Sequence, residues 1–329
     1  MSKTTKILLQ QKSGLLSDLQ SDTIFGHFCW RMREIAGEEK LKEFLKFYKN
    51  NEPVFTISDN LFEKDGEVFF PKPIYSRPIS EKEKLTKAEK LKQMCIYKER
   101  KSKKYIDKDT LNFFLSGDYE NYEKNIDNSE SIKTFEDHLR TNVQISRDTL
   151  TAEKGKLFSY SPKYLNSHLK KNESPVDMCL LIKVIDQKNY VDFNCEELIK
   201  EVFRIGYGKK KSSGFGEFEI KGDITEYDEI NEPVNSNGFI CFSNYLPSKD
   251  EKITDSYYDY HVKYGKLGEQ YSQSDKPFKK PIIFFTQGSC FKTSNKEEWY
   301  GRCTNESDKI STKPEVIQNG IAFTLKIKI

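Results

Sequence analysis

The chain has 329 residues, 32% of them charged, but 54 Lys and Arg nearly balance 51 Asp and Glu, which leaves a net charge of +3. This length suits roughly two domains, and the small net charge excludes a surface that is basic throughout. Seven widely spaced cysteines without a CxxC pair indicate reduced thiols, and no metal or cofactor is expected. No segment approaches the roughly 20 apolar residues of a membrane span, so we expect a soluble cytoplasmic protein.

A strand and an amphipathic helix open the chain. Residues 4–10 predict the strand, and Ser21 or Asp22 is a candidate cap for the helix. Gly26 weakens this helix, so we expect a close packing contact at Gly26 to compensate. The apolar face, at helical spacing, consists of Ile24, Phe25, Phe28, Met32 and Ile35.

Two short elements and a charged insertion follow. Apolar spacing predicts a helix over 38–49, and an Asp-Gly pair indicates a hairpin over 62–70. Residues 81–104 hold ten Lys and Arg against four Glu, whereas residues 107–137 hold nine acids against three bases. We favour a solvated, charged helical insertion over about 76–137 with some disorder. The alternative is a basic face for RNA and an acidic face for a protein partner.

The next segment predicts a hairpin and then a central strand. Extended residues with spaced polar side chains over about 138–160 indicate a protruding pair of strands, a thumb. Its polar residues Arg140, Asn142 and Arg147 could line RNA or could be ordinary surface residues, and composition does not decide. The continuous apolar run over 176–185 predicts a buried central strand.

A glycine-rich loop over 206–216, Gly-Tyr-Gly-Lys-Lys-Lys-Ser-Ser-Gly-Phe-Gly, is the most informative stretch. It joins a helix over 195–205, with a capping box of Asn194 and Glu197, to a strand over 216–222. Glycine reaches positive φ, so successive amides can turn inward as an anion-binding nest, and lysines and serines suit phosphate. The order helix, glycines, strand excludes a Walker loop and a dinucleotide fingerprint. A lysine-rich connection with a glycine C-cap is the alternative.

The order of elements predicts a β-α-β-β-α-β, ferredoxin-like plan, although no RNP-type aromatic motif is present. Residues 223–236 predict a boundary, after which a smaller, mostly β half of the same general kind follows. In that half we expect residues 260–273 to be partly flexible. Its expected strands are 238–242, 282–286 and 321–329.

Several of these stretches match a known family in order and spacing over nearly the whole chain. They are LQSDTIFGHFCW at 19–30, the segment 147–158, the glycine loop, PFKKP at 277–281 and GSCF at 288–291. Together they resemble the RAMP superfamily of CRISPR proteins, in particular the subunit-four family of type III-A (Csm) effector complexes. The resemblance implies an α+β fold of two ferredoxin-like (RRM-like) halves, 1–225 and 226–329, with a thumb hairpin and a glycine-rich loop.

The resemblance also implies a function. Such a subunit does not cut RNA; it holds the 5′ tag of the CRISPR RNA (crRNA) in a pocket between the halves. Its partners are the large polymerase-like subunit and the first backbone RAMP subunit. We expect Tyr207 or Phe215 to stack on bases. The implied RNA contacts are Gly206, Gly208, Lys209, Lys210, Lys211, Ser212, Ser213, Gly214, Phe215, Gly216, Arg140, Asn142, Arg147, His27, Lys279 and Lys280.

Two other functions stay open. Related RAMP proteins process repeat RNA by metal-independent acid-base cleavage, in which His27 or His138 would be the base. Against this, His27 has the features of a helix-surface or interface residue. The third reading is a protein scaffold whose glycine loop is only a tight turn, so that alanine at Lys209, Lys210 and Lys211 would leave RNA retention unchanged.

Overall fold

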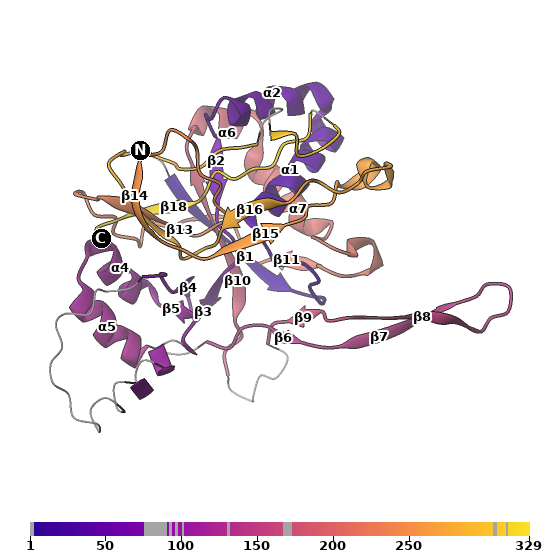
Figure 1. Cartoon of the computed structure of the whole chain (residues 1–329), viewed down its shortest axis with the longest axis horizontal. Coiled ribbons are helices and arrows are strands. Elements are labelled where there is room, and N and C mark those ends of the chain that lie inside the picture. The colour runs from indigo at the N-terminus through magenta and orange to yellow at the C-terminus, as the bar shows by residue number, and fades with distance from the viewer. Residues whose placement is uncertain are drawn as a thin grey trace.

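In a computed structural model the described chain forms an eight-stranded and a four-stranded antiparallel sheet, three two-stranded ribbons, of which one is a long projecting hairpin, and several helices (Figure 1). No helix in the part of the chain described below is long and apolar enough to cross a membrane. The structure describes residues 3–75, 91, 94–95, 98–100, 102–129, 132–166, 173–304, 308–313 and 315–329. Most of the basic stretch 81–104 lies outside these residues, so the interpretation of that stretch stays a prediction.

The first sheet has the ferredoxin-like strand order. Numbered along the β-α-β-β-α-β plan, its central strands β11, β1, β10 and β3 follow the spatial order 4-1-3-2. All eight residues of β10 are buried, which confirms the predicted central strand. The strands are β1 (Lys3–Gln11), β2 (Phe55–Ile57), β3 (Leu61–Lys64), β4 (Glu67–Pro71), β5 (Tyr105–Ile106), β10 (Asp177–Val184), β11 (Phe218–Ile220) and β12 (Thr225–Glu226).

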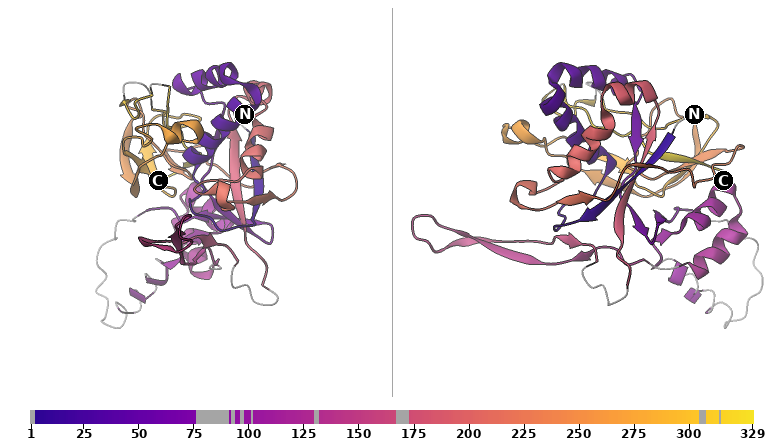
Figure 2. Two further views of the ribbon diagram at one scale, coloured as in Figure 1. Left: turned by 90° about the vertical axis from the view of Figure 1, so that its right-hand side faces the viewer. Right: turned by 180° about the vertical axis from the view of Figure 1, so that it is seen from behind.

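Helices cover one face of this sheet and enclose an aromatic core (Figure 2). In this core, Phe25 contacts Phe44 and Tyr48, with ring centroids 6.1 and 4.6 Å away. These apolar contacts explain why the helical spacing of the sequence predicted the helices correctly. The helices are α1 (Ser21–Ala36), α2 (Glu38–Lys49), α6 (Gln187–Asp192) and α7 (Cys195–Arg204).

Helix α1 starts differently from the prediction. Its N-cap is Gln20, and Ser21 and Asp22 are its first helical residues, so neither is the cap. The Ser21 amide donates to the Asp59 carboxylate at 2.7 Å. A side chain distant in sequence therefore satisfies the helix end, which no local pattern reveals.

Two further expectations for α1 are wrong. Ile35 is 57% exposed, because it lies in the last turn, outside the core. A Cβ added at Gly26 would meet no atom within 4 Å, so no close packing contact compensates for this glycine. Gly26 instead lines a cavity. The other predicted face residues are buried, namely Ile24, Phe25, Phe28 and Met32.

The predicted capping box of α7 is also wrong. Asn194 is the N-cap but has left-handed backbone dihedrals, and its side chain makes no capping hydrogen bond. Glu197 pairs with Arg204, 7 residues later in the same helix, and does not reach back to the N-cap. The left-handed backbone of Asn194 prevents the extended N-cap geometry that a capping box needs.

The second sheet repeats the 4-1-3-2 order without helices of its own. With β13 counted as strand 1, its strands lie in the order β18, β13, β17, β14 from one edge to the other, which is 4-1-3-2. Among the described residues after 226, no segment is α-helical, and the boundary itself stays a prediction. The strands are β13 (Gly238–Cys241), β14 (Ile253–Tyr257), β17 (Cys290–Thr293) and β18 (Thr324–Ile327).

Two helices from the charged insertion pack on this second sheet. Helices α4 (Lys108–Ser116) and α5 (Tyr119–Asn128) bury Leu111 and Phe114 in a core with Leu325 of β18. The solvated, partly disordered state that we expected is therefore wrong for residues 108–128. Their apolar residues are few, but they all face one shared core.

Two hairpins complete the fold. The thumb is confirmed as a long projection built by β7 (Arg140–Ile145) and β8 (Ala152–Tyr160), with β6 (Glu136–Asp137) and β9 (Lys163–Tyr164) at its base (Figures 1 and 2). The segment 260–273, which we expected to be partly flexible, holds regular structure: β15 (Tyr260–Lys263) pairs with β16 (Ile282–Phe285), and a 3-10 turn follows at Glu269–Gln273. Its flexibility stays a prediction.

Candidate nucleic-acid interface

The glycine loop adopts a backbone that needs its glycines. Gly206, Gly208, Gly214 and Gly216 all have positive φ, as does Lys210 at 60°. A Cβ added at Gly216 would lie 1.9 Å from the Tyr207 carbonyl oxygen, which no relaxation of a side chain relieves. The glycines therefore shape a compact loop between α7 and β11.

The glycine amides point into the protein. The Gly208 amide donates to His27 Nε2 at 3.2 Å, and the Gly216 amide donates to the Gly14 carbonyl at 3.0 Å. The amides of Gly206 and Gly214 are also occupied, by carbonyls of Phe203 and Lys211. These four glycines shape the loop, and their amides are not available to an anion.

Unpaired donors lie in the middle of the loop instead. Lys210 is left-handed and Lys211 begins a short 3-10 turn (Lys211–Ser213), the alternation that forms a nest. The amides of Lys210, Lys211 and Ser212 have no acceptor among the described residues. Ser212 and Ser213 are exposed. The loop thus offers three neighbouring amide donors to an outside anion.

The three lysines have different surroundings. Lys209 is exposed and has no ion-pair partner among the described residues. Lys210 Nζ lies 3.9 Å from the centre of the Tyr160 ring and 5.1 Å from that of Phe158, both on β8. Lys211 Nζ pairs with Glu269 at 2.7 Å. The loop therefore contacts the thumb through Lys210 and the 3-10 turn at Glu269–Gln273 through Lys211.

The predicted stacking residues are not available for stacking. Tyr207 is fully buried; its hydroxyl donates to the Asp18 carbonyl at 2.8 Å and accepts from the Gln20 amide at 3.1 Å. Phe215 is 8% exposed and packs edge-on against Tyr160. Both stacking predictions are therefore wrong, because each ring is used inside the fold.

The thumb carries an exposed ring that was not predicted from the sequence. Phe158 is 48% exposed and lies two residues before Tyr160 on β8, with ring centroids 6.4 Å apart. The alternation of side chains along a strand was the signal that places both rings on one face. This face adjoins Lys210 of the glycine loop.

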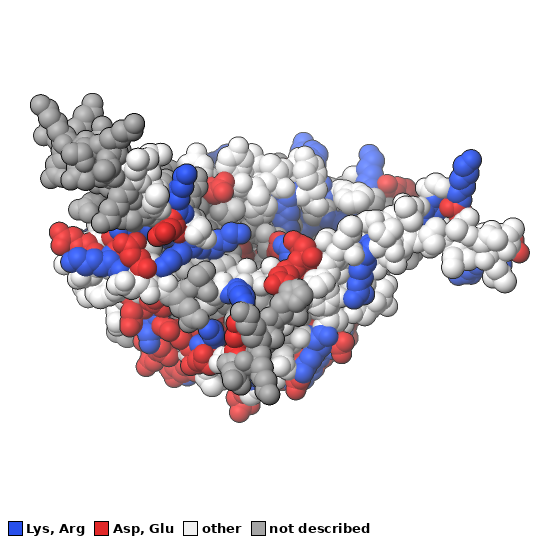
Figure 3. Space-filling model, turned by 90° about the horizontal axis from the view of Figure 1, so that it is seen from below, with Lys and Arg blue, Asp and Glu red and all other residues white. Residues whose placement is uncertain are grey.

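The other thumb candidates are spread along the projection. Arg140 near the base donates to the Tyr164 hydroxyl at 2.7 Å. Asn142 is half-buried, and Arg147 is exposed in the turn at the far end. Lys and Arg side chains are spaced along the whole projection (Figure 3). The structure therefore brings only the thumb base to the glycine loop.

His27 has a structural role in the loop. Burial and the nearby Lys211 charge lower the pKa of His27 to about 4, so the imidazole is neutral at pH 7. Its Nε2 accepts the Gly208 amide, which places the ring proton on Nδ1. His27 thus holds the loop against α1, and its contact with RNA stays a prediction.

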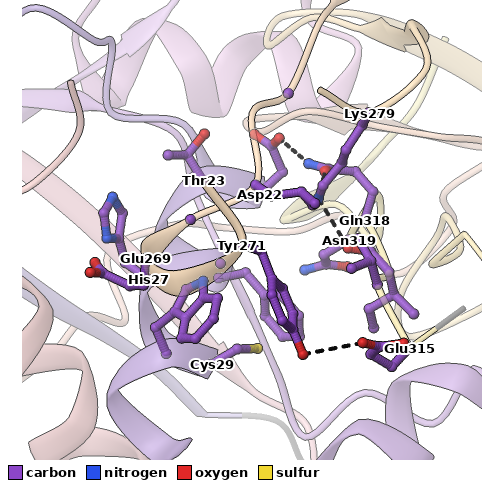
Figure 4. Close-up of a pocket in the computed structure, with 18 of the residues that line it drawn as sticks. Asp22, Thr23, His27, Cys29, Glu269, Tyr271, Lys279, Glu315, Gln318 and Asn319 are labelled. Carbon is purple, nitrogen blue, oxygen red and sulfur yellow. Dashed lines mark hydrogen bonds between the residues drawn. The ribbon is translucent and has the colours of Figure 1, made fainter. Parts of the chain in front are cut away.

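A cavity of about 400 Å³ lies between α1, α2 and segments of the second half (Figure 4). His27 and Glu269 lie at one side of it and Lys279 at the other. Lys279 donates to Gln318 at 2.6 Å, and burial lowers its pKa to about 8. Lys280 is exposed outside the cavity. The two predicted lysines therefore serve different surfaces.

A buried polar network joins the two halves beside this cavity. Asp22 accepts from Lys263 at 2.7 Å, from Asn244 at 2.9 Å and from Gln318. Burial raises the pKa of neighbouring Asp59 to about 7. The surface of the cavity is mostly apolar, as in ligand pockets, and Trp30 contributes to it. Charged side chains, among them Arg33, Lys42 and Glu315, also line the cavity.

Comparisons with known proteins agree on one fold. A family model described as the RAMP superfamily matches residues 3–219, and no curated protein matches the sequence. A chain in the crystal structure of the Csm3-Csm4 subcomplex of the type III-A CRISPR-Cas interference complex has a TM-score of 0.63 at 17% identity, covering 99% of this chain and 100% of that chain. Chains in the crystal structures of the Csm1-Csm4 cassette in complex with cA4 and with pppApA have TM-scores of 0.59 and 0.58. Each is 15% identical to this chain, and each match covers 99% of this chain and 98% of the other.

Proposed function

This chain belongs to the RAMP superfamily, and from that premise we propose that it is the non-catalytic, tag-binding subunit of a type III-A CRISPR effector complex. It binds the 5′ tag of the crRNA and anchors the large polymerase-like subunit to the RAMP backbone. Csm4 is the component common to the descriptions of the similar structures, which also name Csm3 and Csm1. These descriptions support one RAMP partner and one other protein partner.

The observation that carries the proposal is the donor group in the glycine loop. The amides of Lys210, Lys211 and Ser212 are unpaired, and Lys209 beside them is exposed. Amides and lysines bind phosphates by position and charge without reading bases. This is the chemistry that a subunit needs to hold one end of an RNA whose sequence is read by pairing elsewhere.

The cavity supports the same site. His27 and Glu269 line the cavity and also contact the loop, through Gly208 and Lys211. A nucleotide bound at the loop would therefore have its base close to a largely apolar pocket between the halves. Phe158 on the thumb base offers a further stacking surface next to Lys210.

Cleavage is disfavoured for His27. A general base must be within reach of the proton it removes and must be able to bind it near neutral pH. His27 Nε2 already accepts the Gly208 amide, and the low pKa leaves little driving force for proton uptake. His138 packs against Tyr164 at the thumb base, with ring centroids 5.1 Å apart. Cleavage is measured together with binding in the test below.

The test uses the co-expressed complex with labelled crRNA that has or lacks the 5′ tag, across a salt series. We expect Lys209→Ala to weaken tag-dependent retention and to reduce the salt slope by about 1, as loss of one phosphate contact does. Lys188→Ala, an exposed lysine on α6, is the matched control and should change neither. Unchanged retention in the triple variant Lys209→Ala/Lys210→Ala/Lys211→Ala would favour a scaffold. Metal-independent cutting lost in His138→Gln would favour a nuclease.

A further inference from the structure

The ribbon of β15 and β16 has two chemically different faces. Along residues 260–267 the side chains alternate between exposed and covered, and Lys263 on the inner face donates to Asp22. Gly265 and Leu267 continue the inner face and line the cavity. The outer face is exposed at Val262, Tyr264 and Ile283, whereas Phe285 at its far end packs against the second sheet.

Aromatic rings and lysines dominate one end of the outer face. Tyr264 is 68% exposed and Phe278 is 63% exposed. Lys266 forms a bridge pair with Phe278, and its Nζ lies 5.9 Å from the centre of that ring. Lys280 is exposed two residues further on. We call these four residues, with Tyr260 at 57% exposure, the ribbon face.

The charges of the ribbon face are uncompensated. Lys266 and Lys280 have no carboxylate partner among the described residues, whereas Lys263 on the inner face is paired with Asp22. Large exposed rings next to free cations need an occupant that offers both flat surfaces and negative charge. Lysine is depleted at the centre of protein interfaces, so a single-stranded nucleic acid fits this composition better.

The ribbon face is continuous with the candidate interface. Tyr264 and Lys266 also line the rim of the cavity, and Glu269, three residues beyond Lys266, pairs with Lys211 of the glycine loop. The segment after β15 and the thumb extend to the same side of the molecule (Figures 1 and 2). An RNA strand at the loop can therefore continue over the rim onto this face.

We propose that the ribbon face is a stacking platform for single-stranded RNA, next to the glycine loop and separate from it. Bases stack on Tyr264 and Phe278, and Lys266 and Lys280 neutralise the adjoining phosphates. Because every base has a flat face, the platform accepts RNA of any sequence. The inference rests on the proposed function, since it extends the path of the same RNA.

The test measures affinity of the assembled complex for crRNA and for a uridine oligomer without a tag. We expect Tyr264→Ala and Phe278→Ala each to weaken both about ten-fold, the loss of one stacked base. Tyr264→Phe keeps the ring and should bind as the unchanged chain does. Val262→Ser, on the same face without a ring, is the matched control. Thermal unfolding and subunit composition of each variant are measured in parallel.

The outcomes separate this inference from the proposed function. Unchanged RNA affinity in Tyr264→Ala and Phe278→Ala would overturn the platform. Loss of a protein subunit, with RNA affinity intact in the complexes that remain, would also overturn it and make the face a protein-docking surface. If Lys209→Ala has no effect but Tyr264→Ala weakens both RNAs, the platform stands and tag binding by the loop fails. Photocrosslinking of 4-thiouridine RNA to peptides containing Tyr264 or Phe278 supports the platform independently.

Discussion

Two glycines in the loop allow a controlled test of why the loop has its shape. Gly214 and Gly216 have similar positive φ values, 80° and 70°, but different surroundings. An added Cβ at Gly214 would meet nothing within 4 Å, whereas at Gly216 it would lie 1.9 Å from the Tyr207 carbonyl oxygen. Alanine at either site has the same backbone penalty, about 1–2 kcal/mol. Only Gly216→Ala adds a clash with backbone.

We expect Gly214→Ala to lower the unfolding free energy by about 1–2 kcal/mol and to retain RNA. Gly216→Ala should lower it by about 1–3 kcal/mol more, the range for overpacking, and should displace Tyr207 and the unpaired amides. Denaturant unfolding of both variants and retention of tagged crRNA by the complex measure the two effects. Equal stability and equal RNA retention in the two variants would refute the account of the loop.

Three further predictions concern the surroundings of the loop and the second core. His27 has a pKa of about 4 in the folded chain, so below pH 6.5 the unfolded chain takes up a proton at His27 that the folded chain does not. Lowering the pH to 5 should therefore reduce the unfolding free energy by about 2 kcal/mol. In urea unfolding, His27→Gln should lack this pH-dependent loss of stability. Asp22→Ala leaves the Lys263 ammonium without its carboxylate and should cost about 3–5 kcal/mol, partly recovered by adding Lys263→Met in a double-mutant cycle. Phe114→Ala should cost about 3–5 kcal/mol by calorimetry if α4 belongs to the common core, and a change below about 1 kcal/mol would contradict that placement.

Elements with a strong local signal were predictable from the sequence. The apolar run of β10 needs no partner to be recognised, and the helical spacing of α1 and α2 reflects the core that they share. Helices α4 and α5 were not predicted as packed elements, because the core that covers their apolar residues combines β4 with β18, about two hundred positions later in the chain. Charge dominated the local composition, and only tertiary structure shows which face is covered.

The candidate site likewise combines features that the local sequence predicts with features that depend on contacts distant in the chain. The positive φ values of the loop follow from its glycines, which the sequence displays directly. The direction of Tyr207 depends on a hydroxyl that bonds the Asp18 carbonyl, from the segment before α1, and no local pattern encodes this contact. The same holds for His27, whose acceptor nitrogen meets an amide 181 positions away.

Helices α4 and α5 share a core with the second sheet, and this has a consequence for synthesis on the ribosome. The second sheet has no described helix of its own. Residues such as Leu111 and Phe114 emerge after β4 and β5, which share their core, but long before β18, which completes that core. At about 5–20 residues per second, translation reaches β18 some 10–40 seconds after α5. During that interval an apolar helical surface is exposed on a half-made chain, and it is open to chaperones or to aggregation. Slow decoding between residues 128 and 324 would lengthen this exposure, so the speed of translation influences how much protein reaches the native fold.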